Sequence, residues 1–374
     1  MNRLKMALFP CVLITVLATF LLRPVVAQAV IPGACGGWSI VPSPNVPLRT
    51  NSLSGVAAVS ANDVWAVGTD GGQKHNIFTL IEHWNGTQWS IVPSPNPGHG
   101  TNRNQLEAVS AVSANDVWAV GFGGTSDGTL IVHWDGTQWR LVSHPPFPSG
   151  SQLTDVTALS ANDVWAVGTF INSSGDNRTL IVHWDGTQWS IVASPNVGLF
   201  DSLRGVTAVS ASDIWAVGGV GIDKTLIEHW NGTRWSVVAS PNHGSSGLTS
   251  VSAISASDVW AVGLGSAHNR FGTLTEHWNG TSWSVVASPS PGSNLTELVG
   301  VVALSTQNVW AVGLISLNNA FQALIEHWDG TQWSVVPNPG SGVQLAGVTI
   351  VPNSSDLWTV GSNGANQTLT EFYC

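Results

Sequence analysis

Charged residues are scarce in this sequence, and basic residues are scarcer than acidic ones. Asp, Glu, Lys and Arg make up 9% of the 374 residues, with 12 Lys and Arg against 22 Asp and Glu and a net charge of −10. Nucleic acids are bound through clustered Lys and Arg, so we expect no nucleic-acid partner. After the first 29 residues every apolar run is interrupted by turn residues, so we expect no further membrane-spanning segment.

The first 29 residues predict a secretory signal peptide. Arg3 and Lys5 precede an apolar run from residue 6 to residue 22, and Ala27-Gln28-Ala29 supplies the small residues typical of a cleavage site. An uncleaved anchor is the alternative, but the run is only marginally long enough to cross a bilayer and contains Pro10. We therefore expect cleavage after residue 29 and a secreted chain of residues 30–374 that forms a single domain and stays monomeric.

Only three cysteines are present, and Cys11 is removed with the signal peptide. Cys35 and Cys374 remain, one near each end of the mature chain. An even pair in an exported protein predicts a disulfide. A lipid-anchored Cys35 is the rival interpretation, but Pro32-Gly33-Ala34 lacks the aliphatic residue that is usual three positions before a lipidated cysteine.

Tryptophan, by contrast, is abundant, and its 20 copies follow an internal repeat of 45 to 53 residues. The string V-W-A-V-G or a close variant occurs seven times, and H-W-[N/D]-G-T occurs six times, each time with a further Trp three residues after the Gly. Each unit predicts four short strands with no helical periodicity between them. This pattern is typical of the blades of a β-propeller.

In the first unit the predicted strands are residues 56–59, 64–67, 79–84 and 89–92. Asn85-Gly86 predicts a type I′ hairpin turn between the third and fourth strands, since Asn-Gly favours the two positive φ angles that this turn requires. Asp63, before the second strand, predicts an Asx-type turn. Pro93 follows the fourth strand and cannot donate a ladder hydrogen bond, so we expect the fourth strand at the outer edge of the blade.

The two ends of the chain predict how the ring closes. Residues 368–374 form a third strand with no fourth, and residues 38–45 form a fourth strand with no blade of its own. The N-terminal strand should therefore complete the last blade. In this alignment Cys374 and Cys35 occupy the positions of Asn85 and Gly86, so a Cys35–Cys374 disulfide would replace the missing hairpin. The predicted fold is an all-β, seven-bladed propeller with four antiparallel strands per blade.

The V-W-A-V-G strands and H-W-[N/D]-G-T-x-W hairpins resemble those of bacterial exported propellers of the YVTN/BNR-like and WD-like repeat group. The resemblance covers essentially all of the mature chain. It implies the propeller fold but no particular activity, because propellers host many unrelated functions. The hairpin is also similar to a shortened Asp-box turn of sialidases, but its spacing differs, so no sialidase activity is implied.

No catalytic motif accompanies the repeat. A sialidase-like mechanism needs a Tyr nucleophile and an Arg cluster, and a galactose-oxidase-like copper site needs more than one Tyr, whereas Tyr373 is the only tyrosine. The six His of the His-Trp element are spread around the ring, too far apart to meet at one ion at the ~2.0–2.1 Å of a zinc–nitrogen bond. We expect these His and the repeated Trp to be structural, and we expect no metal and no cofactor.

Ligand binding is expected where the repeats differ. The second-to-third loops and the interblade loops vary and share one face of the ring, called here the variable face, whereas the first-to-second and third-to-fourth turns are nearly constant. Sites concentrate on loops held by a rigid scaffold. The candidate ligand-binding residues on the variable face are Phe170, Arg178, Lys224 and Phe271.

A second group of candidates lies at the entry to the innermost strand. Glu107, Asp155 and Arg204, in three consecutive units, stand where most other units have small neutral residues, and would place two carboxylates and a guanidinium at the mouth of the central channel. Asp155 aligns one position later than the other two, which leaves open that it points to the other side of its strand. The interpretations are a polar ligand site, a hydrolytic acid/base pair, or an ion-pair cluster without function.

These observations together predict a secreted, non-enzymatic binding protein that uses the variable face for a glycan or protein ligand. One alternative is a carbohydrate-active hydrolase centred on Glu107 and Asp155. The other is a purely structural interaction scaffold.

Overall fold

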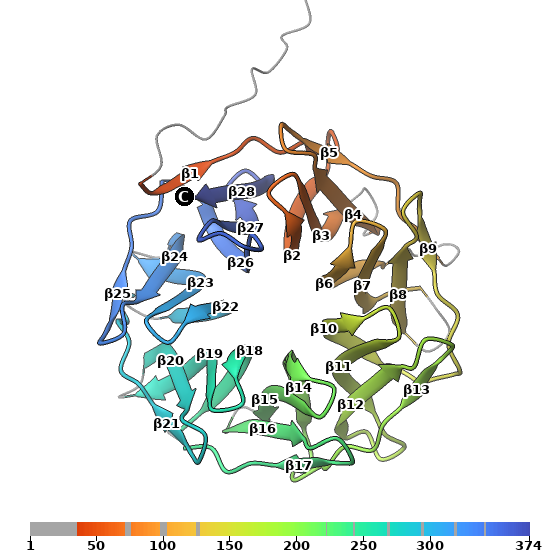
Figure 1. Cartoon of the computed structure of the whole chain (residues 1–374), viewed down its shortest axis with the longest axis vertical. Helices are drawn as coiled ribbons and strands as arrows, with labels where there is room; N and C mark the ends of the chain where they lie inside the picture. The colour runs from red at the N-terminus through yellow and green to blue at the C-terminus, as the bar shows by residue number, and fades with distance from the viewer. Residues whose placement is uncertain are drawn as a thin grey trace, which may run out of the picture.

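The computed structural model describes residues 36–71, 76–97, 103–124, 128–221, 223–241, 244–267, 270–292, 295–317, 320–339 and 342–374. Its strands form seven four-stranded antiparallel sheets, which are arranged as blades around a central axis (Figure 1). The predicted all-β, seven-bladed propeller is confirmed. Within these described ranges, no helix is long and apolar enough to cross a membrane.

The blades follow one another along the chain. Blade 1 comprises β2 (Thr50–Ser60), β3 (Asp63–Gly71), β4 (Ile77–Trp84) and β5 (Trp89–Ile91). Blade 2 comprises β6 (Gln105–Ser113), β7 (Asp116–Phe122), β8 (Thr129–Trp134) and β9 (Trp139–Leu141). Blade 3 comprises β10 (Gln152–Ser160), β11 (Asp163–Ile171), β12 (Asn177–Trp184) and β13 (Trp189–Ile191). Blade 4 comprises β14 (Asp201–Ser210), β15 (Asp213–Val220), β16 (Lys224–Trp230) and β17 (Trp235–Val237).

The remaining three blades continue this order. Blade 5 comprises β18 (Ser246–Ser255), β19 (Asp258–Ala267), β20 (Arg270–Trp278) and β21 (Trp283–Val285). Blade 6 comprises β22 (Thr296–Ser305), β23 (Asn308–Leu317), β24 (Ala320–Trp328) and β25 (Trp333–Val335). Blade 7 comprises β26 (Gly342–Ile350), β27 (Leu357–Asn363), β28 (Thr368–Tyr373) and the N-terminal β1 (Trp38–Ile40). In each blade the first strand lies nearest the axis and the short fourth strand lies at the rim (Figure 1).

The N-terminal strand closes the ring as predicted. β1 pairs with β28, and Trp38 lies opposite Tyr373 just as Trp89 lies opposite Trp84 in blade 1. The Gly36 N–H donates to the carbonyl oxygen of Cys374 at 2.9 Å, so the two ends meet at the predicted position. Cys35 itself lies outside the described residues, and the disulfide stays a prediction.

Every innermost strand contains a β-bulge at the same place. In blade 1, Leu53 pairs with Gly68 and Gly55 pairs with Val67, which leaves Ser54 without a partner on β3. A Cβ on Gly68 would lie 2.1 Å from the carbonyl oxygen of Ser52, and the equivalent glycines of the other blades are equally crowded. This contact explains the glycine of V-W-A-V-G. The bulge residues are Ser54, Glu107, Thr154, Arg204, Thr249, Val299 and Ala346.

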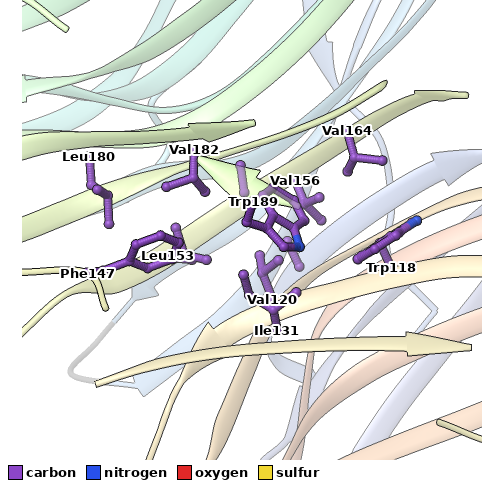
Figure 2. Packing of buried hydrophobic residues seen from close by; sticks show 12 residues of the cluster. Trp118, Val120, Ile131, Phe147, Leu153, Val156, Val164, Leu180, Val182 and Trp189 are labelled. Carbon is purple, nitrogen blue, oxygen red and sulfur yellow. The ribbon is translucent and has the colours of Figure 1, made fainter. Parts of the chain in front are cut away.

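The hydrophobic core lies between neighbouring blades. The Trp118 ring of blade 2 packs against Trp184 and Trp189 of blade 3, with ring centroids 5.3 and 5.5 Å apart. Figure 2 shows this cluster, in which Trp118 and Trp189 are surrounded by aliphatic side chains of both blades. The same contact recurs around the ring, with Trp310 of blade 6 against Trp38 of β1 at 5.7 Å and Trp358 of blade 7 against Trp89 of blade 1 at 5.2 Å. The repeated Trp residues therefore hold the blades together, as the sequence predicted.

The repeated His-Trp pair fastens the third strand to the first-to-second turn. In blade 1 the His83 ring stacks on Trp65 with centroids 4.2 Å apart, and its Nε2 lies 2.8 Å from Oδ1 of Asp63. The indole N–H of Trp84 donates to the carbonyl oxygen of Ala61 at 3.1 Å. The acceptor for the histidine is Asp63 or its counterpart in five blades and Asn308 in blade 6. The six histidines are His83, His133, His183, His229, His277 and His327.

Two predictions about turns are wrong. Asn85 and Gly86 do not form a type I′ turn, because positive φ is confined to Gly86 (+90°) and the loop has four residues between the paired Trp84 and Trp89. The Asn85 side chain stabilises this loop by accepting the N–H groups of Thr87 and Gln88, each at 3.0 Å. The Asx-type contact expected at Asp63 is thus found in the hairpin, whereas Asp63 accepts a hydrogen bond from histidine.

Candidate functional site

A cavity of about 730 Å³ lies on the propeller axis, lined by the innermost strands of all seven blades. The lining comes from the first half and the middle of each strand, as with Ser54–Val56 of β2, and it includes Phe122 at the end of β7 and Asn177 at the start of β12. Phe122 and Asn177 adjoin second-to-third loops, and the first half of each innermost strand follows an interblade loop. The cavity therefore opens on the variable face.

Glu107 is the bulge residue of β6, and its side chain lies in this cavity. Bulges redirect a side chain relative to the regular strand, which accounts for its position toward the axis. The Gln105 Nε2 donates to Glu107 Oε1 at 2.5 Å. Burial raises the pKa of Glu107, and the bond from Gln105 opposes this change. Among the described residues, no Lys or Arg forms an ion pair with Glu107, so its carboxylate is available to a ligand.

Arg204, the bulge residue of β14, supplies the positive charge of the cavity. Its side chain is exposed in the cavity, and no other Lys or Arg is found among the described lining residues. Burial raises the pKa of Glu297 in β22, and the nearby charge of Arg204 lowers it. The lining thus holds Glu107 in blade 2, Arg204 in blade 4 and Glu297 in blade 6.

Sequence comparison missed Glu297, although a signal for it exists. Glu297 directly precedes Leu298, the fully buried residue before the bulge, and the equivalent position is Gln105 in blade 2 and Gln152 in blade 3. The candidates Glu107, Asp155 and Arg204 all follow this leucine. Because the bulge follows the leucine, residues on both sides of it reach the cavity.

Asp155 lines the same cavity but has a different environment. Its Oδ1 accepts the N–H of Val156 at 2.9 Å, and its Oδ2 accepts the N–H of Val206, in the next blade, at 2.8 Å. Burial raises the pKa of Asp155 to about 7, and these two bonds oppose the change. The Oδ2 atom thus connects blade 3 to blade 4, whereas Oδ1 is bonded within β10, one residue after the bulge at Thr154. Glu107 and Asp155 are not a pair of free carboxylates.

Phe170 and Arg178 lie opposite each other on β11 and β12, outside the cavity. Phe170 is partly buried against the core between blades 2 and 3. Arg178 donates to the carbonyl oxygen of Gly198 at 2.6 Å and to Oδ2 of Asp176 at 2.9 Å. The guanidinium therefore holds the loop between blades 3 and 4 in place.

Lys224 and Phe271 are exposed on the variable face but do not line the cavity. Lys224 begins β16 in blade 4, and Phe271 lies near the start of β20 in blade 5. The four loop candidates are therefore spread over three blades, and the structure does not bring them together into one site.

No family model and no curated protein matches this chain. Among solved structures, YCF48 bound to D1 peptide has a TM-score of 0.58 at 14% identity, covering 91% of this chain and 97% of that one. YCF48 from Cyanidioschyzon merolae has a TM-score of 0.59 at 16% identity, covering 90% and 99%. The fucose-specific lectin from Aleuria aurantia has a TM-score of 0.49 at 12% identity, covering 79% and 96%. The likeness to the two YCF48 structures is one of fold: this chain shares the propeller architecture with them.

Proposed function

We propose that this chain is a secreted, non-enzymatic binding protein whose ligand, a protein segment or a glycan, occupies the mouth of the axial cavity. The observation that supports this most strongly is a break in the sevenfold repetition. The bulge residue is small or uncharged in five blades, and it is Glu107 in blade 2 and Arg204 in blade 4. Charged groups that the repeat does not require therefore face the cavity on the variable face.

The neutral bulge residues show what the fold requires at this position. Thr154 donates its hydroxyl to the carbonyl oxygens of Val167 and of Leu203 in the next blade, at 3.1 and 2.9 Å. Thr249 makes the equivalent contacts in blade 5. Since Ser54 and Ala346 also fit here, a charged bulge residue is not needed for folding, which supports a role for Glu107 and Arg204 in binding.

The surroundings of Asp155 favour binding over hydrolysis. Glycoside hydrolysis uses a pair of carboxyl groups, one as acid and one as nucleophile or base. Each oxygen of Asp155 already accepts a backbone N–H group, one of them from the next blade, so the contacts of Asp155 favour a structural role over that of a second catalytic carboxyl. The shared fold with YCF48, which has been solved with a D1 peptide bound, supports a peptide as one class of ligand. Residues 1–29 support secretion, because they have the pattern of a signal peptide.

A binding screen tests the proposal. Residues 30–374 would be applied to a glycan array and to an array of short random peptides, with Glu107→Gln/Arg204→Gln alongside. The control is Arg234→Gln, which removes an exposed arginine from the constant face of blade 4. Losing charged hydrogen bonds costs ~1.5–3 kcal/mol, so we expect the double variant to bind its strongest hit about 10- to 100-fold more weakly and the control to bind normally. Equal binding by wild type and double variant would refute the site.

A further inference from the structure

A group of exposed apolar side chains lies on the variable face between blades 3 and 4. Ile171 ends β11, and Val197, Leu199 and Phe200 belong to the loop between β13 and β14. Each of the four is 51–62% exposed, although burying such side chains is favourable by ~25 cal/mol per Å². Clustered apolar side chains on a surface mark sites of interaction. These four residues are called the apolar shelf below.

The loop that carries the shelf is held by polar contacts of its backbone. The N–H groups of Val197 and Gly198 both donate to Oδ2 of Asp201, at 2.6 and 3.0 Å. The carbonyl oxygen of Gly198 accepts from Arg178, and that of Phe200 accepts from the backbone of blade 4. The backbone is therefore fixed before any ligand arrives, and this preorganisation lowers the entropic cost of binding.

The shelf is continuous with the axial cavity through Asn177. Asn177 lines the cavity, pairs with Ile171 across β11 and β12, and forms a parallel bridge with Phe200 on its other side. Neighbouring strands lie ~4.7–4.9 Å apart, so Ile171 and Phe200 are each one strand spacing from the wall of the cavity. A ligand at the cavity mouth would extend directly onto the shelf.

We propose that the apolar shelf binds aliphatic side chains of an extended protein segment whose neighbouring charged or polar residue enters the axial cavity beside Glu107 and Arg204. This inference rests on the function proposed above and narrows the ligand class to a polypeptide. Three of the four shelf side chains are aliphatic, and aliphatic surfaces match apolar protein side chains, whereas sugars stack on aromatic rings. An occupant of both shelf and cavity must combine apolar and charged groups over a short length, as a polypeptide does.

The test compares a shelf variant with a matched control on the same face. Val197→Ser/Leu199→Ser removes two shelf side chains that are more than half exposed, so the fold should be retained, as an unchanged Tm would verify. The control is Leu48→Ser, which removes a 98% exposed leucine from the equivalent interblade loop between blades 7 and 1. Both variants, the wild type and Glu107→Gln/Arg204→Gln would be applied to the random-peptide array and the glycan array.

We expect wild type to bind peptides rich in aliphatic residues. The shelf variant and the cavity variant should each bind these peptides about tenfold more weakly or worse, and the Leu48 control should bind them normally. Peptide binding that is lost in the cavity variant but kept in the shelf variant would overturn the proposed role of the shelf and leave the proposed function standing. Hits confined to glycans would have the same consequence. An equal loss of peptide binding in the Leu48→Ser control would show that the peptides adhere unspecifically to exposed apolar side chains, and would overturn the proposed role of the shelf. Absence of binding to either array would overturn both.

Discussion

Replacing Glu326 with glutamine should stabilise the protein at pH 8.5 and leave its stability nearly unchanged at pH 5. Glu326 belongs to the third strand of blade 6, its side chain is fully buried, and neither carboxylate oxygen has a hydrogen-bond partner among the described residues. Burial raises the pKa of Glu326 from 4.5 to about 8, because the charged form is poorly solvated there.

The direction of the pH dependence follows from proton binding. The folded protein keeps the proton on Glu326 up to about pH 8, whereas the unfolded chain releases it near pH 4.5. Between these values the folded state binds more protons, so the free energy of unfolding falls as pH rises, by up to ~1.4 kcal/mol per pH unit for each such group. A pKa moved from 4.5 to about 8 corresponds to a loss of about 5 kcal/mol at most.

Four further glutamates occupy the same position in other blades and act in the same direction. Glu82, Glu228, Glu276 and Glu371 are also fully buried, and burial raises the pKa of each to about 7 or 8. His327 opposes them, because burial lowers its pKa from 6.5, but only below that pH. The window from pH 6.5 to 8.5 therefore avoids the opposing effect of His327, and Asp155, whose pKa burial raises to about 7, acts in the same direction as the glutamates.

Urea unfolding across that window provides the assay. We expect the free energy of unfolding of the wild type to fall steadily as pH rises. The fall should be smaller, by about one proton's contribution, in Glu326→Gln and in Glu326→Val. Valine is a suitable replacement because Val182 fills the equivalent position in blade 3. Asp223→Asn, at an exposed carboxyl, is the control and should keep the wild-type slope. A wild-type stability that is flat or rises with pH, or an unchanged slope in both Glu326 variants, would refute the reasoning.

Three further predictions concern the scaffold. Gly168→Ala places a Cβ 1.9 Å from the carbonyl oxygen of Gln152, so it should destabilise the protein by about 3 kcal/mol or prevent folding. The control Gly37→Ala has open space around the new Cβ and should leave the stability unchanged in a thermal unfolding measurement. His183→Phe should cost less stability than His183→Ala, because in blade 7, which lacks the histidine, Phe372 packs against Trp358 with ring centroids 5.0 Å apart. Equal losses would show that the ring contact is unimportant. A Cys35–Cys374 disulfide should leave no titratable thiol in the unreduced mature chain and add at most roughly 5 kcal/mol to its stability, and two free thiols would disprove it.

The repeat in the sequence was sufficient to predict the architecture. Seven V-W-A-V-G elements gave the number of blades, and the unpaired strands at the two ends gave the closure by β1. These features depend on hydrophobic periodicity and turn residues, which are local properties of the chain. The contact of Asp63 was less predictable, because its hydrogen-bond partner is a histidine 20 residues further along the chain. The hairpin at Asn85 was predicted at the right place but with the wrong turn type, because the Asn85 side chain bonds to the N–H groups of Thr87 and Gln88 in a longer loop.

The candidate site was predicted only in part because it depends on the bulge. Glu107 and Arg204 were found as departures from the repeat, and the structure places both in the cavity. Glu297 also lies in the cavity, and Asp155 bonds to the next blade. The polar residues before the repeated leucine were a signal for the first, and the one-position offset of Asp155 left the second open, but the hydrogen-bond partner of Asp155 is not visible in the residue pattern. The glycine of V-W-A-V-G is the one local sign of the bulge, since it faces a carbonyl oxygen in every blade.

The central claim is that a single site on the propeller axis binds the ligand. Isothermal titration of the strongest array hit into residues 30–374 tests it most directly, because the repeated elements would offer six or seven equivalent sites and the axis offers one. The account predicts one ligand per chain and an affinity about 10- to 100-fold lower with Glu107→Gln/Arg204→Gln. A stoichiometry of several ligands per chain, or an unchanged isotherm in the variant, would contradict it.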